Sequence, residues 1–119
     1  MSGFLFFLFP AIIFLYLYFM SWANGYIEKL KKGEVVQFRP KGNSMTGKIN
    51  SGQLCTVRPL EINEPNIGQI VLCKVNGFQY LHLVKAKQEE RASIGNNKGK
   101  INGCTSIKNI YGICIAIEN

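Results

Sequence analysis

The chain has 119 residues and a formal net charge of +7, from 14 Lys and Arg residues against seven acidic residues, which are all Glu. This length allows one small domain. The basic residues are scattered and not interleaved with aromatic residues, so they suit a surface near anionic lipid headgroups and no nucleic-acid partner is expected. The four cysteines lack CxxC or Cys/His spacing, so neither a metal nor another cofactor is expected.

The N-terminal segment is strongly apolar. Residues 3–20 contain no charged residue. With residues 21–23 the run reaches the length of a membrane-spanning helix, which is roughly 20 residues. The alternative is a cleaved signal peptide, because Ser21-Trp22-Ala23 has small residues spaced like a cleavage site. No Lys or Arg precedes the run, and it is longer than a usual signal-peptide core, so we predict a retained anchor over residues 1–24.

The side of the membrane that holds the remaining chain stays open at this point. Lys29, Lys31 and Lys32 follow the anchor and no basic residue precedes it, which favours a cytoplasmic C-terminal domain. A reduced compartment would suit four unpaired cysteines, although an even number also permits disulfides outside. The cysteines are Cys55, Cys73, Cys104 and Cys114.

Residues 25–34 are expected to form a juxtamembrane linker or short helix that Gly33 ends. Residues 35–119 alternate in the manner of short strands, and Asn76-Gly77 is a strong hairpin signal. Strands are predicted over 35–38, 54–58, 69–75, 78–85 and 110–117, with another short strand from residue 93 and a loop over 95–103. The expected fold is mainly β: a small, partly closed antiparallel domain.

Two residue types in this domain indicate a catalytic possibility. Ser44 lies in the turn Gly42-Asn43-Ser44-Met45, where its hydroxyl can be exposed and its own N–H can face a developing oxyanion. A serine hydroxyl needs a neighbouring base, and His82 is the only histidine of the chain. On the residues alone, a turn serine and a packed histidine explain the same pattern.

Several further motifs follow in the same order along the chain as in one known superfamily. The domain therefore resembles the superfamily that joins signal peptidases to self-cleaving SOS-type repressors. Residues 42–45 match its Gly-x-Ser-Met motif, 51–57 and 67–72 its two glycine turns into strands, 80–84 its base-bearing return strand and 110–115 its late glycine-containing strand. The resemblance implies Ser44 as nucleophile and oxyanion donor. His82 falls where the endoplasmic-reticulum and archaeal-type signal peptidases have histidine. Met45 would form a wall of the substrate groove.

The sequence also departs from the family pattern. Gly47 stands where a proline is expected, and Gln53 and Gln69 stand where aspartates are expected. No aspartate is available to orient His82, so Asn97 or Asn102 would take this role as an amide does in cysteine proteases. An amide stabilises the imidazolium less than a carboxylate does, which predicts slow turnover. Lys85 is a less suitable base, because a regular strand would turn it to the opposite face from His82.

The leading interpretation is a membrane-anchored serine endopeptidase resembling signal peptidase. Its partners would be membrane lipid and extended segments of a peptide or preprotein substrate, with small side chains near the cleaved bond. The resemblance favours an extracytoplasmic domain, against the charge pattern. The alternative is a catalytically degenerate member that serves as a membrane-tethered binding module. A self-cleaving regulator is less favoured, because the upstream stretch has no Ala-Gly or Cys-Gly junction.

Overall fold

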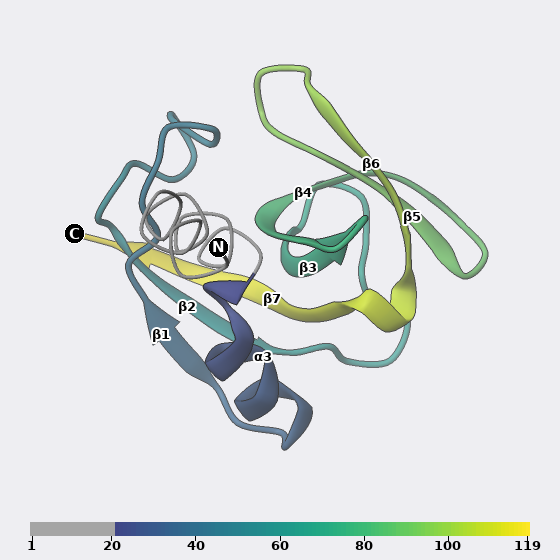
Figure 1. Cartoon of the computed structure of the whole chain (residues 1–119), viewed down its shortest axis with the longest axis horizontal. Coiled ribbons are helices and arrows are strands. Elements are labelled where there is room, and N and C mark those ends of the chain that lie inside the picture. The colour runs from purple at the N-terminus through teal and green to yellow at the C-terminus, as the bar shows by residue number, and fades with distance from the viewer. Residues whose placement is uncertain (1–20) are drawn as a thin grey trace, which may run out of the picture.

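The computed structural model describes residues 21–119, which form one antiparallel sheet with a short helix against it (Figure 1). The predicted membrane-spanning run lies almost entirely outside the described residues. Within 21–119, no helix combines the length and the apolar character needed to span a membrane. The elements are α3 (Asn24–Lys31), β1 (Val36–Phe38), β2 (Leu54–Pro59), β3 (Ile70–Val75), β4 (Phe78–Gln88), β5 (Arg91–Gly95), β6 (Ile101–Ser106), the 3₁₀ turn η1 (Ile107–Asn109) and β7 (Ile110–Glu118).

The seven strands have the order β1-β2-β7-β3-β4-β5-β6, and every neighbouring pair is antiparallel. Register shifts between β2 and β7, β3 and β7, β4 and β5, and β5 and β6 bend the sheet. The sheet curls until β6 comes back to β3, where the Thr105 hydroxyl donates to the carbonyl of Lys74 at 2.7 Å. The predicted mainly β class is therefore confirmed.

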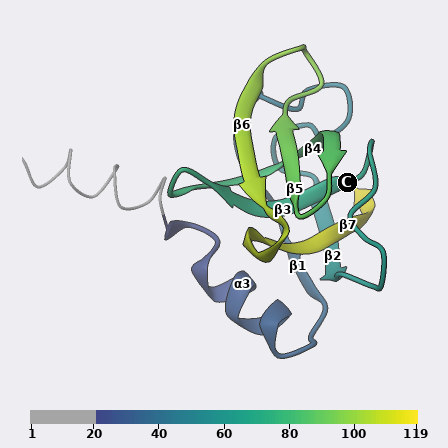
Figure 2. The ribbon, with the colours of Figure 1, turned by 90° about the vertical axis from the view of Figure 1, so that its right-hand side faces the viewer.

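The helix α3 packs on the β1–β2–β7 end of the sheet (Figure 2). Ile27 and Leu30 are its buried residues and join one of two apolar clusters. Gln79 on β4 holds the start of the helix, because its Oε1 accepts from the Ala23 N–H at 2.7 Å and its Nε2 donates to Asn24 at 2.6 Å. Ala23, near the end of the predicted anchor, is thus fully buried against the β domain.

The strand predictions differ from the structure mainly after residue 85. The hairpin at Asn76-Gly77 is present, and these residues have φ of 50° and 85°. Positive φ at both central residues is what a type I′ turn requires. The segment predicted as a loop over 95–103 is wrong at both ends, because β5 includes Gly95 and β6 begins at Ile101. The polar composition of this segment hid the end of β5 and the start of β6, which is an edge strand paired with β5.

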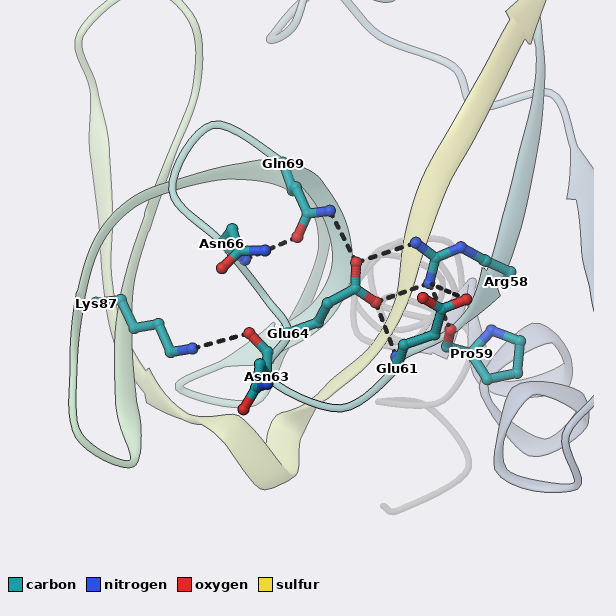
Figure 3. Close-up of polar contacts among 8 residues, drawn as sticks. All are labelled: Arg58, Pro59, Glu61, Asn63, Glu64, Asn66, Gln69 and Lys87. Carbon is teal, nitrogen blue, oxygen red and sulfur yellow. Dashed lines mark hydrogen bonds and ion pairs between the residues drawn. The ribbon is translucent and has the colours of Figure 1, made fainter.

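The link between β2 and β3 is held by an ion pair (Figure 3). Arg58 donates two hydrogen bonds to the Glu64 carboxylate, at 2.7 and 3.0 Å, and Gln69 donates a third at 2.9 Å. Only 9% of the Glu64 side chain is exposed. These donors stabilise the charged carboxylate and lower its pKa to about 2, with the Arg58 hydrogen bonds as the largest cause.

Gln53 and Gln69, which stand where the resembled pattern has aspartates, occupy two turns of the same kind. In each Asn-x-Gly-Gln sequence the glutamine N–H donates to the asparagine carbonyl at 3.1 Å, and Gly52 and Gly68 have φ of 86° and 91°. In return, Gln53 and Gln69 accept from the asparagine N–H at 2.8 and 2.7 Å. The glutamine side chains therefore close the turns without an aspartate.

Candidate active site

The turn that carries Ser44 is fixed by the residues on either side of it. Met45 and Ile49 are each only 5% exposed, and the Met45 carbonyl accepts from the Ile49 N–H at 2.8 Å. Ser44 itself is exposed, so the turn presents the hydroxyl while its neighbours join the core. Gly47 has φ of 100°. Proline cannot adopt this conformation, so the proline of the resembled pattern would not fit this turn.

Ser44, His82 and Asn102 form a continuous chain of side-chain contacts. Ser44 Oγ lies 2.9 Å from His82 Nε2, and His82 Nδ1 lies 2.7 Å from Asn102 Oδ1. His82 comes from β4 and Asn102 from β6, while Ser44 comes from the segment between β1 and β2. The curl of the sheet is what brings these three parts of the chain together.

The position of Asn102 Oδ1 selects one tautomer of the His82 ring. An amide oxygen only accepts, so the nitrogen that faces it, Nδ1, must carry the proton. Nε2 is then the unprotonated nitrogen and accepts from the Ser44 hydroxyl. This is the arrangement that a general base needs before it takes the serine proton.

The surroundings of His82 favour the neutral form of its ring. The pKa of its imidazole is lowered, mainly because the ring is buried and also because the Lys100 cation is near, while the Asn102 hydrogen bond acts in the opposite direction. His82 is 6% exposed and lies beside Tyr80, with ring centroids 4.9 Å apart. Within residues 21–119 no carboxylate forms a hydrogen bond or ion pair with His82.

Asn97 has a different role from Asn102. Its Nδ2 donates to the Thr46 carbonyl at 2.9 Å, so it ties the β5–β6 loop to the Ser44 turn and makes no hydrogen bond to His82. Its Oδ1 is buried and has no hydrogen-bond partner within the described residues. Lys85 lies on β4 next to the bulge at Val84–Ala86 and does not line the pocket of the site.

A pocket of about 670 Å³ adjoins Ser44 and His82. Met45 lines it, as expected for a groove wall, and so do Trp22, Tyr26 and Phe38, whose rings contact one another. Both edges of the sheet reach this pocket, because Phe38 belongs to β1 and Asn102 to β6.

The backbone at Ser44 leaves a donor free for an incoming oxygen. Within residues 21–119 the Ser44 N–H donates to no other group, whereas the Gly42 N–H donates to Ser51 Oγ at 3.3 Å. A free N–H on Ser44 is the group that an oxyanion role for this residue would require. The glycine at position 42 offers no side-chain donor.

The cysteines are poor candidates for an alternative nucleophile. All four are free thiols, none of them lines this pocket, and burial raises the pKa of Cys55 and of Cys73 to about 12. Thiols with so high a pKa stay protonated and unreactive near neutral pH. Within the part of the chain that the structure describes, no cluster of three or more His, Cys, Asp or Glu side chains is placed to hold a metal ion.

Sequence reasoning expected a loop over 95–103 but gave Asn96 no separate role in the site. Asn96 is 8% exposed, and its Oδ1 accepts from the N–H groups of Lys98 and Lys100 at 2.8 and 3.0 Å. This side-chain turn places Lys100 near His82. In the sequence alone, an asparagine in a glycine-containing loop is common in turns of no special role.

Compared with protein-family models and with curated proteins, the sequence gives no match. Only the geometry of this site and the resemblance of its motifs therefore bear on the function.

Proposed function

We propose that this chain is a membrane-anchored serine endopeptidase of the signal-peptidase-like type. The observation that carries the proposal is the chain of contacts from Ser44 Oγ through the His82 ring to Asn102, with separations of 2.9 and 2.7 Å. In this mechanism Ser44 is the nucleophile, His82 the general base and Asn102 the positioning residue.

The reaction follows from these positions. Ser44 Oγ attacks the scissile carbonyl carbon while His82 Nε2 takes the hydroxyl proton, and the Ser44 N–H donates to the resulting oxyanion. The imidazolium then gives its proton to the leaving amine as the C–N bond breaks, which leaves an acyl-enzyme. Water attacks this ester with His82 again as base, so that the acid product is released and Ser44 is restored.

The position of the pocket supports a substrate that is extended and near the membrane. β1 and β6 are the two edge strands, and each contributes a residue to the pocket, so a peptide in extended form could add to an edge. Trp22, which also lines the pocket, follows closely on the charge-free run of residues 3–20. A bond close to the bilayer surface is therefore the expected site of cleavage.

The test uses the full chain purified in detergent and a mixed peptide library, with products identified by mass spectrometry. Wild-type protein should release fragments, and Ser44→Ala and His82→Ala should each lower the rate roughly 100-fold or more. Ser93→Ala, on β5 and outside the pocket, is the matched control and should retain the wild-type rate. Cleavage at the wild-type rate by Ser44→Ala would show that Ser44 is not the nucleophile.

A second candidate is a binding module on the same scaffold that has lost catalysis. The observation that favours it is the amide at position 102, since an imidazolium forming in a buried site gains less from an amide than from a carboxylate. It predicts peptide binding that is equal in wild type and Ser44→Ala, with no fragments from either across the neutral and mildly alkaline pH range.

A further inference from the structure

The pocket beside Ser44 is lined by cations and by no acidic residue. Arg39, Lys41 and Lys100 all line it. None of the seven glutamates of the chain, all of which belong to the described part, contributes to it. Lys98 adds a fourth cation at its border, because its Nζ donates to the Asn43 carbonyl at 3.4 Å. We call these four residues the cationic rim.

The rim lacks compensating charge within residues 21–119. The ion pairs of this region use Lys31 and Arg58, and none uses a rim residue. The Arg39 side chain donates to the Gly52 carbonyl at 2.8 Å, and the Lys98 side chain donates to the Asn43 carbonyl. The ammonium groups of Lys41 and Lys100 have no hydrogen-bond partner among residues 21–119. The last two are therefore free to bind an anion from outside.

The local structure holds the rim around the nucleophile. Arg39 and Lys41 belong to the segment that leads from β1 to Ser44, and Lys98 and Lys100 to the loop between β5 and β6. Both segments lie at the same end of the molecule (Figure 2), where the hydrogen bond from Asn97 to Thr46 joins them. The cations thus surround a concave site, which suits a side chain of a bound peptide better than a flat lipid surface.

We propose that this site selects peptide segments with aspartate or glutamate side chains within a few residues of the cleaved bond, bound by Lys41 and Lys100. This inference rests on the proposed peptidase function and names its substrate class. A substrate carboxylate next to Lys100 would also reduce the repulsion between that cation and the imidazolium that forms on His82. The acidic group would therefore favour both binding and the transition state.

The primary test measures binding, so that it does not depend on catalysis. The full-length Ser44→Ala chain in detergent is titrated against two labelled alanine-rich peptides, one with glutamates on both sides of a central Ala-Ala and the other with glutamines there. The acidic peptide should bind about tenfold more tightly at low salt, because it forms two exposed ion pairs that each contribute modestly, and the difference should shrink at high salt.

Two double variants distinguish the effect of the cationic rim on binding from the effect of the net charge of the chain. Lys41→Gln/Lys100→Gln should abolish the preference, whereas Lys87→Gln/Lys108→Gln removes the same charge away from the pocket and should preserve it. Equal binding of the two peptides, or equal losses in both double variants, would overturn the inference. The same holds if vesicles with anionic lipid bind through Lys41 and Lys100 while the acidic peptide does not.

Cleavage by the wild-type chain then distinguishes this inference from the proposed function. If both peptides are cleaved at equal rates, the peptidase function is supported and the charge preference is refuted. Charge-dependent binding without cleavage would support an acidic-segment site and refute the peptidase.

Discussion

Replacing Asn102 by Asp gives the most direct test of the proposed mechanism. The amide oxygen lies 2.7 Å from His82 Nδ1. A carboxylate in its place would make a charge-assisted hydrogen bond to the ring. A carboxylate also fixes the tautomer of the ring. An amide that turns its N–H toward His82 Nδ1 would place the ring proton on Nε2, the nitrogen that faces Ser44, whereas a carboxylate has no N–H to present.

The size of the effect follows from the two kinds of hydrogen bond. A neutral bond contributes about 1 kcal/mol and one to a charged group about 1.5–3 kcal/mol, so the imidazolium gains roughly 0.5–2 kcal/mol. The middle of this range corresponds to about a tenfold higher rate, and the gain also raises the pKa of His82. Asn102→Leu, which removes the acceptor, should lower the rate by about tenfold or more.

The assay is kcat/KM for one cleaved peptide, measured from mildly acidic to mildly alkaline pH. In the wild type, burial and Lys100 lower the pKa of His82 from 6.5, so the base stays neutral and activity should fall only below that pH. In Asn102→Asp the fall should begin at higher pH, while the rate at mildly alkaline pH rises. Asn66→Asp, in the exposed link between β2 and β3, adds the same charge away from the site and should change neither quantity.

A folded Asn102→Asp variant with an unchanged rate at mildly alkaline pH and an unchanged pH midpoint would refute the reasoning. In that case Asn102 would be a packing residue and His82 would not collect a proton in the slow step.

Two predictions concern the fold. Glu64→Gln should lower the free energy of unfolding at neutral pH by about 2 kcal/mol, measured by urea titration, because it breaks a pair with Arg58 that is largely buried on the glutamate side. The pKa of Glu64 is depressed from 4.5 to about 2, so the wild-type contribution is complete above pH 4.5 and should be lost as the pH falls toward 2. Glu61 is 73% exposed, so Glu61→Gln is a control with little effect, and an equal loss in both variants would contradict the ion-pair argument. Gly112→Ala should cost about 1–3 kcal/mol or more, because a methyl group there overpacks the core. Its Cβ would lie 2.6 Å from Val57 Cγ1 and 2.7 Å from the Arg58 carbonyl oxygen. Gly25→Ala, with open space around it in α3, should be neutral or stabilising, and equal losses at both glycines would refute the packing argument.

The parts of the fold that depend on local pattern could be predicted from the sequence. The alternation over 69–75 and 78–85 and the Asn76-Gly77 turn are properties of neighbouring residues, and the corresponding hairpin is present. β6 was missed because its sequence is polar and contains Gly103, although its partner is the preceding strand β5. Asn97 and Asn102 could not be separated in advance, since only the curl of the sheet decides which amide reaches His82.

The rim residues illustrate a further limit of sequence reasoning. Lys41 and Lys100 are far apart in the sequence, and counted along the chain they belong to a scattered set of cations. The fold gathers them around Ser44 and places the glutamates elsewhere, so a property that looked like overall charge is a property of one pocket.

The missing aspartate and the cationic rim bear on the same step of the proposed reaction. A carboxylate at position 102 would stabilise the imidazolium in every encounter, whereas an amide leaves that charge with little support beside Lys100. If the substrate brings its own carboxylate to Lys100, the environment that lowers the pKa of His82 is partly neutralised only when an acidic segment is bound. Catalysis would then depend on the substrate for part of its electrostatic stabilisation, and Asn102→Asp should narrow the difference in kcat between the acidic and neutral peptides. A difference in kcat that Asn102→Asp leaves unchanged would show that the substrate charge acts on binding alone.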